Sequence, residues 1–208
     1  MSSSTQVRIA VGPVRTFLAV VLALAVGIGG VLGYQALASP SSAGGSLLGT
    51  LTGGGPGVGV ADGVVPDGTT VFDDHVPAVA NLDPELLAAL RSAAADAGDD
   101  AVAFTVNSGW RSPAYQDQLL REAVGEYGSE EEAARWVATA DTSAHVSGDG
   151  VDVGPMRAMD WLAQHGAGYG LCQIYGNEPW HYELRPEAVD GGCPPMYRDP
   201  TEDPRMQD

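Results

Sequence analysis

One stretch near the N-terminus has a composition that cannot build a packed core. The folded part of the chain must therefore lie outside this stretch. Residues 39–68 read SPSSAGGSLLGTLTGGGPGVGVADGVVPDG, rich in Ser, Gly and Pro and without hydrophobic periodicity. This composition is typical of a flexible tether, and about 30 such residues span on the order of 30 Å. We therefore expect a linker at 39–68, a folded domain at 69–195 and an acidic C-terminal tail at 196–208.

The segment before this linker has the pattern of an export signal. Arg8 and Arg15 precede an apolar run from Phe17 to Leu32, and Ala36-Leu37-Ala38 offers a cleavage site of small residues. With its flank, the run has about 20 residues, which is also enough to cross a bilayer as a helix. Residues 1–38 are therefore predicted to be a signal peptide or an N-terminal membrane anchor. Either one places the remainder on the exported side of the membrane.

The part of the chain after residue 38 is strongly acidic. It holds 8 Arg and 27 acidic residues, a net charge of 8 − 27 = −19, and the chain has no Lys. Such a surface repels phosphate backbones, so no nucleic-acid partner is expected. Solubility is the plainer interpretation of this acidity.

Two cysteines, Cys172 and Cys193, are present, and neither belongs to a CxxC motif. An even pair in an exported chain favours one disulfide that closes a short loop. Two free buried thiols are the alternative.

The order of helix and strand signals favours an α+β fold. Asp83-Pro84 is typical of a helix start, and the apolar residues that follow lie on one side of that helix: Leu86, Leu87, Leu90 and Ala94. Strands are predicted at 101–109, 170–175 and 180–184, the last two as a hairpin, and further helices at about 113–124, 130–138 and 155–166. Helix, strand, helices and then strands indicate a small antiparallel sheet packed with helices.

Two short stretches hold a candidate metal site. His145 and Asp152 lie seven residues apart with glycines between them, and Glu178 lies three residues before His181. Two imidazoles and one carboxylate are a ligand set of catalytic zinc, and a nearby second carboxylate can move the proton of a water molecule. The alternative is that both histidines are ordinary hydrogen-bonded residues and that Asp152 caps the helix after Pro155.

Three blocks in one order sharpen this choice: SGWRSPAYQ at 108–116, SAHVSGDGVDVG at 143–154 and EPWHYEL at 178–184. Together they resemble the VanY-like branch of the D-alanyl-D-alanine carboxypeptidases. The family pattern is S-G-[YW]-R-S, then S-x-H-x-x-G-x-x-x-D, then E-x-x-H, and the match spans roughly residues 75–187. These zinc peptidases share their fold with the Hedgehog signalling domain and lysostaphin-type peptidases.

The resemblance implies a role for each matched position. His145, Asp152 and His181 correspond to the ligands of one Zn²⁺ ion, and Glu178 corresponds to the catalytic base. Arg111 corresponds to the residue that steadies the carbonyl oxygen as it gains negative charge. Two further matches, Ser143 and Gln116, correspond to positions near the substrate.

The chain also departs from the family pattern in three places. Gly150 stands where alanine or another small residue is common, and VATADT at 137–142 lacks the usual Pro-Gly before S-x-H. The second change affects the expected rim of the substrate cleft. The cysteine pair is an addition, and it would brace the chain on both sides of Glu178 and His181.

The resemblance implies an exported zinc peptidase that removes the terminal D-Ala from peptidoglycan stem peptides, working at the outer face of the membrane or in the cell wall. One alternative keeps the zinc site but cuts another bond, L-Ala-D-Glu or a cross-bridge. An alternative of another class is a wall-binding module that holds zinc for stability alone. The presence of both a candidate base and a candidate oxyanion residue favours an enzyme.

Overall fold

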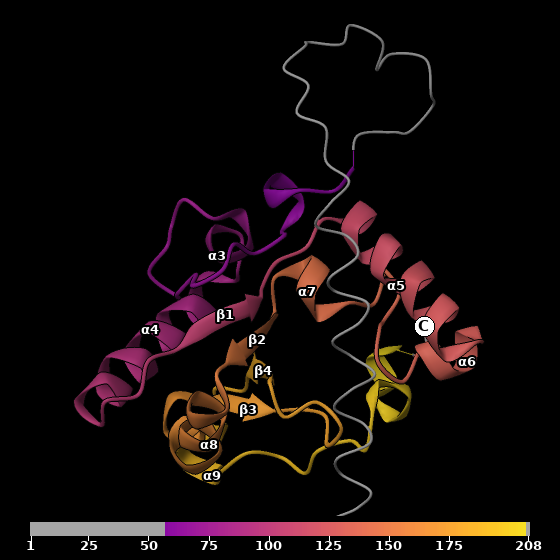
Figure 1. The fold of residues 1–208 in the computed structure, drawn as a ribbon. Coiled ribbons are helices and arrows are strands. Elements are labelled where there is room, and N and C mark those ends of the chain that lie inside the picture. The colour runs from indigo at the N-terminus through magenta and orange to yellow at the C-terminus, as the bar shows by residue number, and fades with distance from the viewer. Residues whose placement is uncertain (1–56, 207–208) are drawn as a thin grey trace, which may run out of the picture. The chain divides into compact units, whose positions relative to one another are not determined.

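The computed structural model describes residues 57–206, and its centre is a four-stranded antiparallel sheet (Figure 1). The strand order is β1-β2-β4-β3, and each neighbouring pair is antiparallel. The α+β class with a small antiparallel sheet is thereby confirmed. The strands are β1 (Thr105–Ser108), β2 (Gly150–Gly154), β3 (Leu171–Gln173) and β4 (His181–Leu184).

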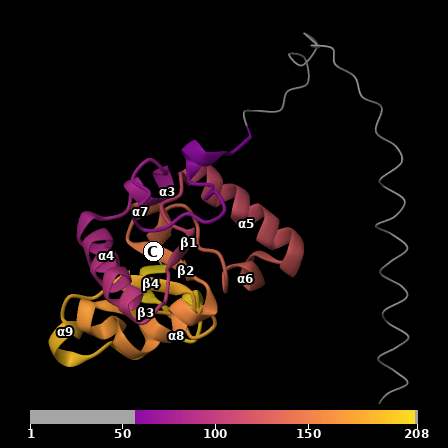
Figure 2. The same cartoon turned by 60° about the vertical axis from the view of Figure 1, so that its left-hand side comes forward.

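Helices flank this sheet on two sides. The helices α4 and α8 contact the sheet and each other, whereas α5 and α6 contact each other and lie on the other side of β1 and β2 from α4 (Figure 2). The α-helices are α3 (Pro77–Ala80), α4 (Pro84–Asp99), α5 (Pro113–Tyr127), α6 (Glu130–Ala133), α7 (Ala144–Ser147), α8 (Met156–His165) and α9 (Ala188–Gly191). The 3-10 turns are η2 (Val60–Asp62), η3 (Gly166–Tyr169), η4 (Pro200–Glu202) and η5 (Pro204–Met206).

Side-chain caps start the two long helices where the sequence predicted. The Asp83 carboxylate accepts hydrogen bonds from the backbone N–H groups of Glu85 and Leu86 at 2.9 and 3.1 Å, and the Ser112 hydroxyl accepts one from Tyr115 at 3.2 Å. These acceptors satisfy N–H groups that the first helical turn leaves unpaired. The buried face of α4 is rotated slightly from the predicted one and consists of Leu86, Leu90, Ala93 and Ala97.

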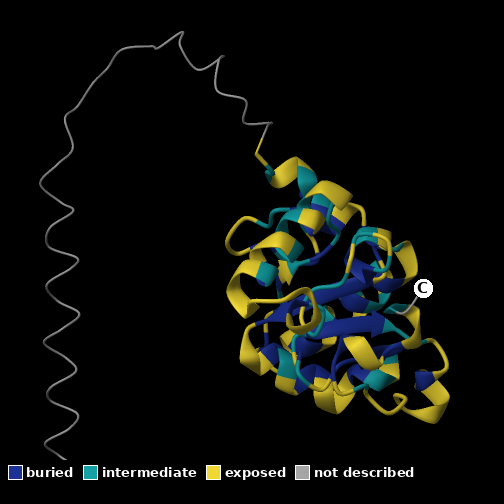
Figure 3. Ribbon diagram, turned by 90° about the vertical axis from the view of Figure 1, so that its right-hand side faces the viewer, coloured by how far each residue is buried: buried dark blue, intermediate teal, exposed yellow. Residues whose placement is uncertain are grey.

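The central strand β2 separates the hydrophobic core from the opposite face of the sheet. All five of its residues are buried, in line with the dark strands at the centre of Figure 3. Because side chains alternate along a strand, Val151 and Val153 enter the core with Leu86 and Tyr182, and Asp152 projects to the other face. The fold thus presents one carboxylate from its most buried strand.

Two local expectations from the sequence are wrong. The strand β2 was not among the predicted strands, because it is only five residues long and has glycine, a residue depleted in strands, at both ends. The helix expected over 130–138 ends at Ala133, and Trp136, beyond this end, is 39% exposed. Trp161 on α8 is buried.

The folded unit is wider than the 69–195 expected from composition. At its start, the Asp62 carbonyl accepts a hydrogen bond from Ser112 N–H at 2.8 Å. At its end, where an acidic tail was expected, Asp199 and Asp203 are fully buried. The predicted signal or anchor at 1–38 and linker residues 39–56 lie outside the described residues. Within 57–206, no helix combines the length and apolar character needed to span a bilayer.

The cysteine pair forms the predicted disulfide. Cys172 in β3 is bonded to Cys193, with 5.6 Å between their Cα atoms and a sequence separation of 21 residues. The bond joins β3 to the segment that follows α9 and encloses both Glu178 and His181.

Replacing Cys172 and Cys193 together by alanine is expected to lower the free energy of unfolding by about 3 kcal/mol, because the unfolded chain regains the entropy of a loop of this length. Urea denaturation of the oxidised wild type and of the double variant measures the difference. The reduced wild type is the control and should unfold like the variant. Equal midpoints for oxidised and reduced protein would contradict this account.

Candidate metal centre

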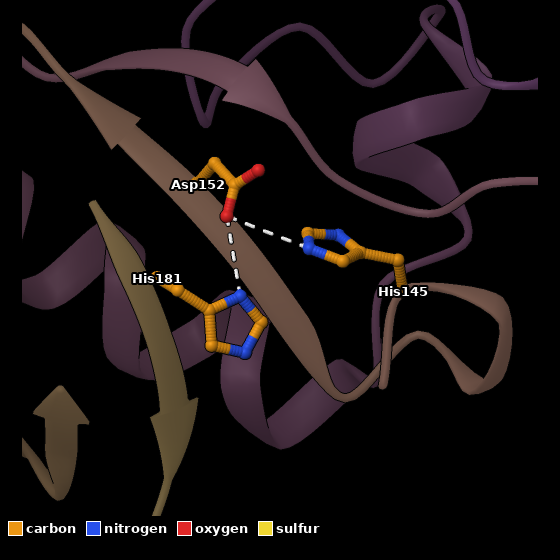
Figure 4. A group of neighbouring side chains, drawn as sticks. All are labelled: His145, Asp152 and His181. Atoms are coloured by element: carbon orange, nitrogen blue, oxygen red, sulfur yellow. Dashed lines mark hydrogen bonds and ion pairs between the residues drawn. The ribbon is translucent and has the colours of Figure 1, made fainter. Parts of the chain in front are cut away.

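Three side chains from separate parts of the chain meet on the open face of β2 (Figure 4). His145 lies in α7, Asp152 in β2 and His181 at the start of β4, and one potential ligand atom from each lies within 4.8 Å of the other two. Asp152 Oδ1 is 3.4 Å from His145 Nε2 and 3.2 Å from His181 Nδ1. All three residues are buried. The structure therefore brings together the three ligands predicted from the sequence.

Local backbone geometry explains this convergence. Asp152 and His181 are directly paired in the β2–β4 register, so their side chains leave the sheet on the same face. Gly148 ends α7 with φ +87°, a left-handed conformation that suits glycine and turns the chain towards β2. A Cβ at Gly150 would lie 2.8 Å from His181 Cε1 and 3.0 Å from Ala144 Cβ. Glycine at 150 therefore makes room for the His181 ring in this chain.

Both imidazole rings are oriented by acceptors on their far side. His145 Nδ1 donates to the Gly109 carbonyl at 2.8 Å, and His181 Nε2 lies 3.2 Å from Glu183 Oε1. Histidine ligands of metals commonly donate their second N–H to a carbonyl or a carboxylate in this way. The remaining nitrogens, His145 Nε2 and His181 Nδ1, face Asp152.

This donor set fits a zinc ion. Two neutral imidazole nitrogens and one carboxylate leave a coordination position for water or substrate, as in catalytic zinc sites. The buried Asp152 carboxylate already has Arg111 as a cationic partner, and a metal ion would supply a second one. Among residues 57–206, His145, Asp152 and His181 are the one such group of His, Cys, Asp or Glu side chains.

The surroundings shift the pKa values of all three groups. Burial alone would raise the pKa of Asp152, but the charges and hydrogen bonds of His145 and His181 hold it well below its usual range. Burial lowers the pKa of His145. Burial acts in the same direction on His181, yet its hydrogen bonds with Asp152 and Glu183 raise its pKa to about 9. These pKa shifts favour an ionised Asp152, a charged His181 and a neutral His145.

Glu178, the candidate base, lines the same cavity as the three ligands. It is 7% exposed, and within the described residues its Oε1 atom is buried without a hydrogen-bond partner. Burial raises the pKa of Glu178 to about 7. A carboxylate with a pKa near neutrality can both take up and return a proton. Its role as base stays a prediction.

Arg111 is held in place beside Asp152. Its Nη2 atom lies 3.2 Å from Asp152 Oδ2, its Nε donates to Ser108 Oγ at 2.8 Å, and its Nη1 donates to Gln116 Oε1 at 3.0 Å. Gln116 is 1% exposed and also donates from Nε2 to the Ala138 carbonyl at 2.8 Å. The structure thus makes Gln116 a support for Arg111. Substrate contacts by Gln116 and by Ser143, which lines the cavity, stay predictions.

The centre opens into a cavity of about 420 Å³, a size typical of ligand sites. Trp180 lies in its wall, and beyond the metal centre the cavity follows α5 to Tyr127 and Trp136. The two last rings are stacked with their centroids 6.0 Å apart. The exposure of Trp136 is therefore explained by its place in the cavity wall.

Sequence reasoning missed Glu183 as a functional residue. It follows His181 by two positions in β4, so both side chains lie on the same face of the strand. This period of two was the available signal. A carboxylate two residues after a candidate metal-ligating histidine on a strand is well placed to orient that histidine.

Comparison with protein families gives one match, over more than half of the chain. Residues 79–187 match the model described as VanY, D-alanyl-D-alanine carboxypeptidase. A search of curated protein sequences gave no significant match.

Solved peptidase structures are similar to this chain. An LdcB LD-carboxypeptidase aligns with a TM-score of 0.50 and 22% identity over 62% of this chain and 71% of its own, which shows a common fold. A variant of the vancomycin-resistance D,D-pentapeptidase VanY in complex with Zn(II) aligns with a TM-score of 0.49 and 25% identity over 54% and 80%. VanYB in complex with D-Alanine-D-Alanine aligns with the same score and identity over 53% and 74%.

Replacing Glu183 by glutamine is expected to weaken Zn²⁺ binding by about 10- to 100-fold, because the His181 ring loses its charged acceptor. Competition with a chromophoric chelator measures the affinity. Glu187→Gln, an exposed neighbour, is the control and should bind zinc like the wild type. Unchanged affinity in Glu183→Gln would remove Glu183 from the metal centre.

The stability of the metal-free chain should depend on pH through Glu178. The unfolded state releases this proton near pH 4.5, whereas the folded state holds it to about pH 7, so stability falls as the pH rises through that window. Glu178→Gln removes this titrating group. The free energy of unfolding of the variant minus that of the wild type should therefore be about 2–3 kcal/mol larger at pH 8 than at pH 4.5. Urea denaturation after chelation, with Glu187→Gln as the control, tests this. A gain independent of pH would contradict it.

Proposed function

Because the chain belongs to the VanY family of D-alanyl-D-alanine carboxypeptidases, we propose that it is a zinc-dependent peptidase that removes the terminal D-alanine from peptidoglycan stem peptides. One observation supports this most strongly. The three candidate ligands, the buried unpaired carboxylate of Glu178 and the guanidinium of Arg111 line one cavity. This is the set of groups that hydrolysis of a peptide bond requires.

One zinc ion per chain would be held by His145, Asp152 and His181. When bound, zinc supplies Lewis acidity, which makes water a nucleophile near neutral pH and polarises a carbonyl group. Gly109 and Glu183 keep the two imidazole rings turned so that one nitrogen of each faces the ion position.

Glu178 would carry the proton. As a carboxylate it accepts the proton of the attacking water, and as a carboxylic acid it returns that proton to the amine of the departing D-alanine. Its raised pKa suits both steps, because neither form is strongly favoured near pH 7. Within residues 57–206 no hydrogen bond competes for its buried Oε1 atom.

Arg111 would face the negative charge that develops on the carbonyl oxygen. A guanidinium group stabilises such charge best when it is already oriented before the reaction. Ser108 and Gln116 fix its Nε and Nη1 atoms, so no reorganisation is needed.

The proposed localisation of the enzyme follows from its proposed substrate. Peptidoglycan lies outside the cytoplasmic membrane, so the domain must be exported. Residues 1–38 would serve as the export signal or membrane anchor, and the linker that follows would give the domain reach into the wall.

Glu178→Gln is expected to release D-alanine from a stem pentapeptide ending in D-Ala-D-Ala about 10²- to 10⁴-fold more slowly than the wild type, because the proton carrier is lost. Its zinc content should be unchanged. Mass spectrometry of the products measures release. Chelation of the wild type should abolish release, and added Zn²⁺ should restore it.

The same products separate the alternatives. Loss of a single D-Ala supports the carboxypeptidase, whereas larger fragments would replace it by an endopeptidase with the same zinc site. Peptidoglycan binding without any cleavage by the zinc-loaded wild type would make the chain a binding module.

A further inference from the structure

The last residues of the described chain lie against the metal centre, although they fall outside the family match at 79–187. We define the C-terminal segment as residues 197–206, which include η4 and η5 and are yellow in Figure 1. The Tyr197 N–H donates to the Ile174 carbonyl at 3.0 Å, which draws the segment towards the cavity. Met206, at its end, lines that cavity.

Arg205 of this segment binds Glu183 with both arms of its guanidinium fork. Its Nη1 donates to Glu183 Oε2 at 2.7 Å, and its Nη2 donates to Oε1 at 3.1 Å. Glu183 Oε1 is also the oxygen that lies 3.2 Å from His181 Nε2. One carboxylate oxygen thus links Arg205 directly to a candidate metal ligand.

The second cation at Glu183 does not share this link. Arg185 Nη2 donates at 2.7 Å to Oε2, the oxygen turned away from His181. Because Glu183 is fully buried, its charge needs paired cations, and a bidentate guanidinium supplies both charge and fixed direction. Arg205 is therefore the group that sets the position of Oε1.

Arg205 is itself fixed by a buried acid. Asp203 is fully buried and accepts hydrogen bonds from Arg205 Nε at 3.0 and 3.1 Å and from the Tyr175 hydroxyl at 3.0 Å. The Tyr175 ring stacks on the His181 ring with centroids 5.3 Å apart and planes 27° apart. The contacts thus close a ring from His181 through Glu183, Arg205, Asp203 and Tyr175 back to His181.

This ring constrains the His181 imidazole in two ways. The stacked Tyr175 limits the tilt of its plane, and Glu183 holds the N–H at Nε2, so that Nδ1 faces Asp152. Arg205 and Asp203 make both constraints depend on the C-terminal segment.

We propose that Arg205 is a positioning residue of the metal centre, which through Glu183 holds His181 in the orientation that binds the metal. The C-terminal segment thereby completes a site whose ligands all lie in the family-matched region. This inference rests on the proposed binding of zinc by His145, Asp152 and His181.

The test compares substitutions at two arginines of the same segment in the full chain. Arg205→Met removes the fork, and Arg205→Lys keeps the charge without it. Arg198→Met is the matched control, because the Arg198 side chain is 69% exposed and pairs with Asp199 and Glu202. Zn²⁺ affinity is measured by chelator competition, and the visible spectrum of the Co²⁺-loaded protein reports the geometry of the centre.

Arg205→Met is expected to lose about 10- to 100-fold in Zn²⁺ affinity and to change the Co²⁺ spectrum, while Arg198→Met matches the wild type in both. Adding Glu183→Gln to Arg205→Met should cost little further affinity, since both act through one contact. Where Arg205→Met does not fold, the lysine variant decides, with an expected loss of at least about 5-fold because it lacks the fork.

Three results would overturn the inference, and they differ in what else they affect. Wild-type affinity and spectrum in folded Arg205 variants, or fully additive losses in the double variant, would remove Arg205 from the metal centre and leave the proposed function standing. A wild type that binds no zinc would overturn both.

Discussion

The pairing of Asp152 with His181 across β2 and β4 is the contact on which the whole arrangement depends. Val151 and Val153 anchor β2 in the hydrophobic core, and the strand's alternation then fixes Asp152 on the opposite face. A slip by one residue would bury the carboxylate in the core and turn valines towards the histidines. The hydrophobic core therefore determines the register, and the register determines the geometry of the metal centre.

The buried carboxylates around this pair are all compensated by partners, with one exception. Asp152 has Arg111 and two histidines, Glu183 has Arg185 and Arg205, and Asp203 has Arg205 and Tyr175. Each ion is compensated, as burial requires. Within residues 57–206, Glu178 is the buried carboxylate with an oxygen left unpaired, and burial raises its pKa. A buried carboxylate without a partner is unusual, and Glu178 lies in a cavity that also holds three potential metal ligands. Such exceptions are typical of functional groups.

Parts of this arrangement were predictable from the sequence because they rest on local chemistry. Asp83 and Ser112 cap helices by accepting hydrogen bonds from N–H groups two or three residues further along the chain. The ordered motifs mark four residues as candidates for the site: His145, Asp152, His181 and Glu178. The strand β2 was missed because it is short and has glycine at both ends. The sequence marks Gly150 only as a departure from the family pattern, whereas in the structure a Cβ at this position would lie 2.8 Å from His181 Cε1. Arg205 was unpredictable: it meets Glu183 across 22 residues, with no period to connect them.

The C-terminal segment shows why the boundary of a family match need not be the boundary of a site. The matched region contains the candidate ligands, Glu178, Arg111 and Glu183, yet the guanidinium group that binds Glu183 with two hydrogen bonds belongs to Arg205. The same segment places Pro200 and Met206 in the cavity wall, to which the stacked Tyr127 and Trp136 also belong. One stretch of chain therefore contacts both the support of a candidate metal ligand and the cavity beside it. A shift of this segment would change both the contact of Arg205 with Glu183 and the cavity wall at Met206, so the proposed metal affinity and substrate fit would change together.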